Sequence, residues 1–331
     1  MSELNYEYHS FEELVDIADK KHNIHHESST SEAADILKIH PYYSLVNGYQ
    51  RALETEENSE KFRDNLSLEY LAQIHTYETI LSSNLLRTLL SFETNIKNIL
   101  QDIISKEFGI CEDDYLNTSL YRNNNSNPNR TKVTERLTNI ARYKSKVTRS
   151  LLKYRENGNV PPWILVNDLT FGELKNWYQI LPVELKKVLL NEFNYFNMPE
   201  DMFLEFFRIS LDILNDFRNG LAHGDILNKI IIRDSVHYHH LSHAFSSSVI
   251  SQQEFNVQHV GKNDLYGAVL ILFMLAPTNY KQLMHVQLKN DLILFDSLIK
   301  LDSSQARRLL GIPDNILDRL DKIKEDLFEH I

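Results

Sequence analysis

The feature that most limits the fold is a long stretch of helical apolar spacing between Leu66 and Phe108. Its apolar residues recur at steps of three, four or seven, which places them on one face of an α-helix. These residues are Leu71, Ile74, Leu81, Leu85, Leu89, Phe92, Ile96 and Leu100. Gly109 follows directly and is a candidate C-cap. The spacing therefore predicts one long helix over this stretch.

The rest of the chain also favours helix. It has 9 glycines and 8 prolines in 331 residues, with 42% hydrophobic residues, so tight turns are few and a buried core is expected. Three Ser/Thr-x-x-Glu patterns predict helix starts, at Ser10 to Glu13, Ser29 to Glu32 and Thr170 to Glu173. Ile230 to Val236 is the one short β-branched run, and it is compatible with a single edge strand or hairpin.

We expect two regions along the chain. Residues 1–58 form a small N-terminal helical module and linker, and residues 59–331 form a larger helical domain. A basic loop and helix near residues 120–156 lengthen that domain. In this segment the polar run from Arg122 to Arg130 predicts a loop, and the residues from about Glu135 to Tyr154 predict a helix.

The sequence favours a cytoplasmic protein. A single cysteine, Cys111, excludes an intramolecular disulfide framework and fits a reducing compartment. The N-terminus is acidic where a secretion signal needs basic and then apolar residues. The longest apolar run, Leu265 to Pro277, is shorter than the roughly 20 residues that span a bilayer, and predicts a buried helix. We expect no membrane partner and no cofactor.

Charge is distributed unevenly. The net charge is −11, which argues against a protein that coats nucleic acid nonspecifically. From Arg122 to Arg155, however, ten Lys/Arg face one acid, so this stretch carries +9 and the remainder −20. Such a stretch is either the solvated side of a helix or a surface for the phosphates of RNA. We favour RNA, with the candidate contacts Arg142, Lys144, Lys146 and Arg149.

A polar stripe marks the end of a predicted helix from Leu204 to His223. Asp212, Asp216, Asn219 and His223 follow at steps of four, three and four, so their side chains share one line of the helix surface. Arg218 lies about 100° around the helix from Asn219, and Gly224 is a candidate C-cap.

An arginine beside a titrating histidine suits RNA cleavage, because a 2′-hydroxyl must lose a proton and the phosphorane must be stabilised. No metal is needed for that chemistry. The simpler reading is that Arg218 and Asp216 form surface ion pairs and that His223 caps the helix.

The motif Arg218-Asn-Gly-Leu-Ala-His223 resembles the Arg-Asn-x-x-x-His signature of HEPN-domain ribonucleases, in the Arg-Asn-x-x-Ala-His form of bacterial abortive-infection (Abi-like) proteins. Further segments are similar to that family in the same order along the chain, and the resemblance covers about Phe11 to Asp318. These segments are Tyr42 to Tyr49, Leu86-Arg87, Phe92-Glu93 with Lys97, Pro161 to Leu174, and Gly311-Ile-Pro313.

The resemblance implies an all-α HEPN-like bundle, a homodimer, and RNA cleavage in antiphage defence. Arg218 and His223 would be the catalytic pair, with Asn219 positioning the phosphate or the histidine. Glu93 would be a supporting residue from the earlier helix, and Asp216 a second one.

Alternatives stay open at this point. The chain could be a noncatalytic RNA-binding or scaffold protein with the same fold, or a toxin restrained by an antitoxin protein or a regulatory RNA. The histidines His237, His239, His240 and His243 form the densest histidine group. His239 and His243 would share a helix face as metal ligands can, but no His-Glu-x-x-His pattern is present. We expect no metal there, and a polar surface or RNA contact instead.

Overall fold

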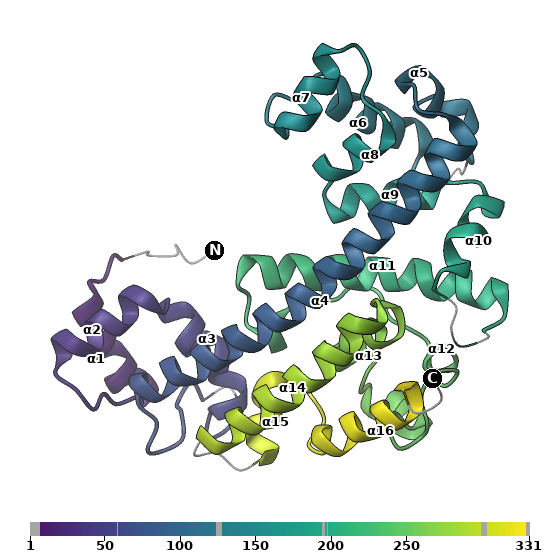
Figure 1. The fold of residues 1–331 in the computed structure, drawn as a ribbon. Helices are drawn as coiled ribbons and strands as arrows, with labels where there is room; N and C mark the ends of the chain where they lie inside the picture. Colours follow the sequence, from purple (N-terminus) through teal and green to yellow (C-terminus); the bar gives the residue numbers. More distant parts are fainter. Residues whose placement is uncertain are drawn as a thin grey trace, which may run out of the picture.

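A 41-residue helix, α4 (Leu68–Phe108), runs along the molecule, and helices from every other part of the chain pack against it (Figure 1). At 1.5 Å per residue it is about 60 Å long. The Ser67 hydroxyl caps its start by accepting from the amide of Tyr70 at 3.2 Å, and Gly109 follows its end at a φ of 91°. The predicted long helix is confirmed.

The computed structural model describes residues 7–57, 59–123, 128–193, 196, 198–298 and 303–328. Within these residues the structure is helical and has no β-strand, which confirms the all-α class. Two isolated bridges, between His25 and Ser67 and between Glu54 and Phe62, are its β-type pairings.

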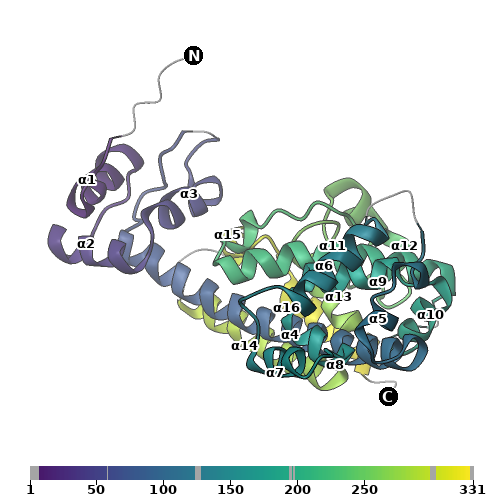
Figure 2. The same ribbon diagram turned by 90° about the horizontal axis from the view of Figure 1, so that it is seen from above.

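The first three helices gather around the N-terminal end of α4, at one end of the molecule (Figure 2). The two predicted capping boxes are present, with Ser10 and Ser29 accepting from the amides of Glu13 and Glu32. The three helices are α1 (Phe11–His22), α2 (Thr30–Ile39) and α3 (Tyr42–Leu53). Because the buried core runs on from them through α4 to the last helix, the division at residue 58 stays a prediction.

The other end of α4 carries the middle of the chain (Figure 1). The third predicted capping box, at Thr170, is present at the start of α9. The elements here are α5 (Glu112–Tyr115), η1 (Thr118–Leu120), α6 (Arg130–Arg142), α7 (Arg149–Glu156), α8 (Pro162–Leu165), η2 (Val166–Asp168), α9 (Phe171–Ile180) and α10 (Val183–Asn191).

The single basic helix predicted near Glu135 to Tyr154 is wrong, because α6 and α7 are separate. Arg155 of α7 donates to the carbonyls of Ile140, Ala141 and Lys144 at 2.8, 2.7 and 3.1 Å, and so satisfies the open end of α6. The Thr148 hydroxyl then caps α7. Of the predicted loop that precedes α6, residues 124–127 lie outside the described residues.

The C-terminal third covers the remaining side of α4. Every residue of α13 is buried, as the apolar run predicted. No helix in the described part of the chain is long and apolar enough to cross a membrane. The elements are α11 (Glu200–His223), η3 (Leu227–Lys229), α12 (Tyr238–Leu241), η4 (Glu254–Gln258), α13 (Leu265–Leu275), α14 (Thr278–Leu298), α15 (Ser303–Leu310) and α16 (Ile316–Phe328).

The edge strand or hairpin considered at Ile230 to Val236 does not form. Its backbone groups bond to other partners: the amide of Arg233 donates to Asp216 at 3.2 Å, and the amide of Val236 donates to the carbonyl of Lys262 at 3.2 Å. The side chain of Ile230 lies so close to Gly220 of α11 that a Cβ there would be 2.7 Å from it. The segment is therefore held by α11 and a loop instead of a neighbouring strand.

A buried carboxyl joins three distant parts of the fold. Glu78 of α4 is 3% exposed and accepts a short hydrogen bond from the Tyr49 hydroxyl of α3. Its other oxygen accepts from the Leu227 amide at 2.5 Å. Burial raises the pKa of Glu78 to about 7, against the lowering effect of these two hydrogen bonds. The segment that follows α11 is thus tied to the N-terminal helices.

Glu78→Gln is expected to remove a pH dependence of stability. Because the folded pKa of about 7 lies above the ordinary 4.5, the contribution of Glu78 is complete below pH 4.5 and is lost as pH rises through 7. The free energy of unfolding of the wild type should therefore fall relative to the variant, by at most about 3 kcal/mol. Urea unfolding across this range measures it, with exposed Glu107→Gln as the control. Parallel pH profiles of wild type and Glu78→Gln would contradict the prediction.

Candidate functional site

The predicted motif lies at the C-terminal end of α11. Gly224 follows the helix with a φ of 74°, a left-handed conformation that glycine adopts without a steric penalty. The amide of Asp225 donates to the carbonyl of Gly220 at 3.0 Å, which ends the helix. His223 is therefore the last helical residue, as predicted, and it is exposed.

Arg218 lies on the side of α11 that faces α4. Its Nε is 3.9 Å from Oε2 of Glu93, and the ammonium of Lys97 is 2.8 Å from Oε1 of the same carboxylate. Glu93 is 6% exposed, so its negative charge lies between two cations and away from water. At 3.9 Å the contact with Arg218 is longer than a hydrogen bond. Neither Nε of Arg218 nor Oε2 of Glu93 has a hydrogen-bond partner among the described residues. Glu93 thus holds the guanidinium near α4 by charge.

Asn219 and His223 lie on the opposite flank of α11, at what we call the motif hollow. This hollow has a volume of about 490 Å³ and lies between the end of α11, α3 and the segment after α11. Tyr43 and Asn47 of α3 and Lys229 of the following segment also line it. The hollow therefore offers a histidine, amide groups, a lysine and an arginine to a bound molecule, beside the carboxylates of Asp216 and Asp225.

The two acidic residues of the predicted stripe, Asp212 and Asp216, form ion pairs with cations outside the motif. Asp216 accepts from the backbone amide of Arg233 at 3.2 Å, and its carboxylate is 3.5 Å from the Arg233 guanidinium. Asp212 is 2.6 Å from Lys175 of α9 and 3.4 Å from Arg208. Asp216 therefore anchors the segment after α11, and it also lines the motif hollow together with Asn219 and His223.

One chain does not bring the arginine and the histidine of the motif together. A step of five residues turns about 140° around an α-helix, so Arg218 and His223 project to different sides. Arg218 lies with Glu93, whereas Asn219 and His223 line the motif hollow, which Arg218 does not. The shared face predicted for Asn219 and His223 is present.

Comparison with known proteins bears on this motif. A family model described as Abi-like protein matches residues 35–228, which is more than half of the chain and includes the whole motif. This chain belongs to the Abi-like protein family. The match is shorter than the resemblance noted in the sequence and ends before the histidine-rich segment. Neither the curated proteins nor the solved structures gave a match.

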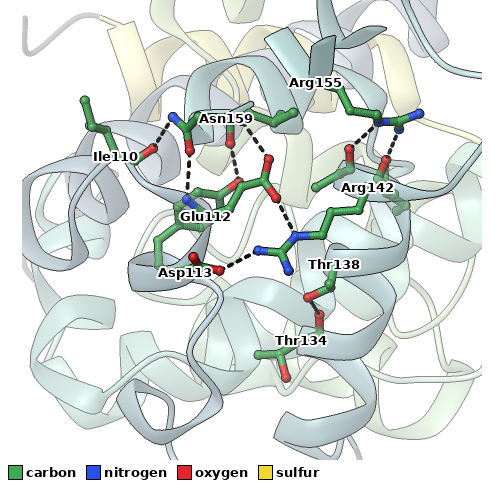
Figure 3. A network of polar contacts seen from close by, with 12 residues as sticks. Ile110, Glu112, Asp113, Thr134, Thr138, Arg142, Arg155 and Asn159 are labelled. Carbon is green, nitrogen blue, oxygen red and sulfur yellow. Dashed lines mark hydrogen bonds and ion pairs between the residues drawn. The ribbon is translucent and has the colours of Figure 1, made fainter. Parts of the chain in front are cut away.

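The basic segment of this Abi-like protein uses part of its charge internally. Arg142 donates from Nε to Glu112 at 2.6 Å and from Nη2 to Asp113 at 2.7 Å (Figure 3). Glu112 is 8% exposed and also accepts from the Val160 amide at 2.7 Å. Arg142 is thus engaged in holding α5 against α6.

The three other predicted RNA contacts follow Arg142: Lys144 and Lys146 lie between α6 and α7, and Arg149 is the first residue of α7. Lys146 and Arg149 are exposed and Lys144 is half-buried. None of the three has an ion pair within the described ranges. They are the part of the predicted surface whose charge is available to a ligand.

Three cations of the predicted basic stretch, Arg122, Lys132 and Arg136, line a cleft that the sequence did not predict. This cleft of about 980 Å³, the basic cleft, opens between α6, α9, α10 and α11. It is lined by six cations and four acids: Arg122, Lys132, Arg136, Lys175, Lys186 and Arg208, with Glu173, Asp201, Glu205 and Asp212. Burial, and then the nearby charge of Arg122, lowers the pKa of Lys186 to about 8. The four-residue step from Lys132 to Arg136 places two cations on one helix face, and this was the sequence signal for the cleft. The helices that form its other walls come from distant parts of the sequence.

The histidine-rich segment lies against the first half of α11. Because α12 spans only Tyr238–Leu241, the helix face predicted for His239 and His243 does not form. His240 is fully buried and stacks at a tilt on Phe206, with 5.5 Å between ring centroids. Burial, followed by the charge of His239, lowers the pKa of His240 to about 4, so its ring is neutral near pH 7.

Arg142→Gln is expected to destabilise the fold, because it leaves the buried Glu112 carboxylate without its cation. Loss of such a partner costs about 1–3 kcal/mol. The matched control, Lys146→Gln, changes an exposed lysine and should stay within about 0.5 kcal/mol of the wild type. Thermal and urea unfolding of the three proteins measure the difference. Equal stability of the two variants would show that the Arg142 ion pairs contribute nothing.

Proposed function

We propose that this Abi-like protein is an endoribonuclease of abortive infection that cleaves RNA without a metal ion. The observation that carries the proposal is the Arg218-Asn219…His223 motif at the exposed end of α11, within the part of the chain that matches the family. Family membership supports a role in abortive-infection defence. An arginine, an asparagine and a histidine are residue types that support RNA cleavage, and we assign this reaction to a HEPN-type site.

The proposed reaction is attack by a ribose 2′-hydroxyl on the adjacent phosphate. A bond forms between O2′ and phosphorus, and the bond from phosphorus to O5′ breaks. His223 takes the proton of the 2′-hydroxyl or gives one to the leaving oxygen, since an imidazole exchanges protons near neutral pH. Arg218 stabilises the negative charge that develops on the phosphorane. Asn219, beside His223 in the motif hollow, positions the phosphate or the imidazole.

Two copies of the chain would complete the site. Within one chain Arg218 and His223 project to different sides of α11. A single chain therefore offers too few of these groups at any one place to act on one phosphate. Asn219, Ala222 and His223 are exposed at the end of the helix. A twofold axis at this end would place two sets of motif residues side by side. Glu93 would then act as a positioning residue, because it holds Arg218 from α4.

A noncatalytic RNA-binding or scaffold protein is the second candidate. The charge contact between Arg218 and Glu93 favours it, because this contact keeps the guanidinium away from His223 in a single copy. A toxin held inactive by an antitoxin protein or a regulatory RNA fits the same observation. RNA binding without cleavage under all conditions would favour the scaffold.

His223→Ala and Arg218→Ala are each expected to lower the rate of RNA cleavage by roughly 10²–10⁴, because each removes a group that acts on the reacting phosphate. Gel assays with total RNA measure the rate, and exposed His243→Ala is the control. Cleavage should persist in EDTA, and its products should end in a 2′,3′-cyclic phosphate or its hydrolysis product. A 2′-deoxy residue at the cut site should block cleavage. Wild-type rates in His223→Ala would exclude this histidine from the chemistry.

Charge reversal at Lys144, Lys146 and Arg149 is expected to weaken RNA binding and to flatten its salt dependence. Three lost contacts with single-stranded phosphates should lower the slope of log affinity against log salt by about 2. Cleavage at saturating RNA should survive, because these residues lie on a different part of the fold from the end of α11. An unchanged slope would instead assign the RNA path to the basic cleft, which Arg122→Glu with Lys132→Glu would then test.

A further inference from the structure

Four side chains with metal-binding groups converge where α12 meets the first half of α11. We call Glu205, His237, His239 and His240 the histidine cluster. The ligand atoms of Glu205, His239 and His240 all lie within 4.8 Å of one another. His237 joins them, with Nε2 3.8 Å from Oε1 of Glu205. The residues come from two elements that are separated by more than 30 positions in the sequence.

His240 is the member that is hardest to explain without a ligand. It is fully buried, and neither ring nitrogen has a hydrogen-bond partner among the described residues. Its Nε2 is 3.4 Å from Oε2 of Glu205, which is a weak and poorly aligned contact, and its Nδ1 has no partner among the described residues. An unsatisfied buried polar group costs about 1–3 kcal/mol. A ligand that accepts the lone pair of one ring nitrogen would remove the part of this cost that belongs to that nitrogen.

The other members are exposed and can adjust their positions. Glu205 and His239 are both exposed, and the rings of His237 and His239 stack at 5.5 Å with an interplanar angle of 7°. Neighbouring ligands of a tetrahedral ion at 2.0–2.1 Å are about 3.4 Å apart. Rotation of the two exposed side chains toward the fixed His240 would close the present separations to that value.

We propose that Glu205, His239 and His240 bind a divalent transition-metal ion of the Zn²⁺ class, with His237 as the fourth group within reach. Imidazole nitrogens with one carboxylate are the ligands that such ions prefer, whereas Mg²⁺ and Ca²⁺ take oxygen ligands. The ion would link α12 to α11 and would give one ring nitrogen of His240 a partner. This proposal differs from the sequence-based expectation of no metal, which considered His239 with His243 and did not include Glu205.

The proposed ion has a place separate from the motif. Glu205 precedes His223 by eighteen residues on the same straight element, which is about 27 Å at 1.5 Å per residue. Glu205 also lines the basic cleft. A divalent cation bound to Glu205 would therefore change the local charge at this edge of the cleft from negative to positive. The site is therefore structural or part of that cleft, and its occupancy does not depend on whether the protein cleaves RNA.

The test measures metal binding by the full-length protein after EDTA has been removed by dialysis. The stripped protein is titrated with Zn²⁺, Co²⁺ or Mg²⁺, and metal content, affinity and melting temperature are measured. We expect one Zn²⁺ per chain, a visible absorption band of tetrahedral Co²⁺, a higher melting temperature with Zn²⁺, and no binding of Mg²⁺.

The variants Glu205→Gln and His239→Asn change exposed ligands, so the fold should be kept, as circular dichroism would check. Each is expected to weaken Zn²⁺ affinity by about tenfold or more, since even outer-shell partners are worth that much. His243→Asn is the matched control, an exposed histidine outside the cluster, and should bind as the wild type does. No Zn²⁺ bound by the wild type, binding of Mg²⁺ as tight as Zn²⁺, or equal affinities in all variants would each overturn the proposal.

Discussion

The packing of other helices along α4 is the constraint on which the rest of the structure depends. This one element contacts the N-terminal helices, the α5 to α10 group and the C-terminal helices. Its buried residues recur along its whole length, so no single neighbour can cover them. The chain must therefore return to α4 several times, and each return places a different segment beside it. Glu78 and Glu93, both buried in α4, are two of the polar points at which the later chain is fixed.

These two carboxylates explain why the motif lies where it does. Glu93 holds Arg218 by charge, and Glu78 accepts from the Leu227 amide just after α11. Both carboxylates are buried. Electrostatic interactions are stronger in the protein interior than in water. The end of α11 is thereby fixed in position while its outer surface, with Asn219 and His223, stays exposed. A fixed helix end with an exposed polar face is suited to a site shared by two copies.

Helix α11 carries two separate sets of functional candidates. Its last two turns bear the arginine and histidine of the motif, and its first half bears Glu205 beside the histidines of α12. Between them, the acids Asp212 and Asp216 pair with cations from α9 and from the segment after α11. Asp212 and Asp216 thus hold neighbouring elements, while Glu205 and the motif residues belong to the two proposed sites.

The sequence by itself determined the features that depend on near neighbours. The long helix, the three capping boxes, the buried α13 and the glycine that ends α11 all follow from residues within one or two turns, so local spacing predicts them. Only the tertiary structure decided that Arg142 pairs with Glu112, that Arg218 faces Glu93 while His223 faces α3, and that Glu205 meets His240. Each of these contacts joins residues at least 30 positions apart, and the direction in which two packed helices face one another is set by the whole core and not by either segment alone.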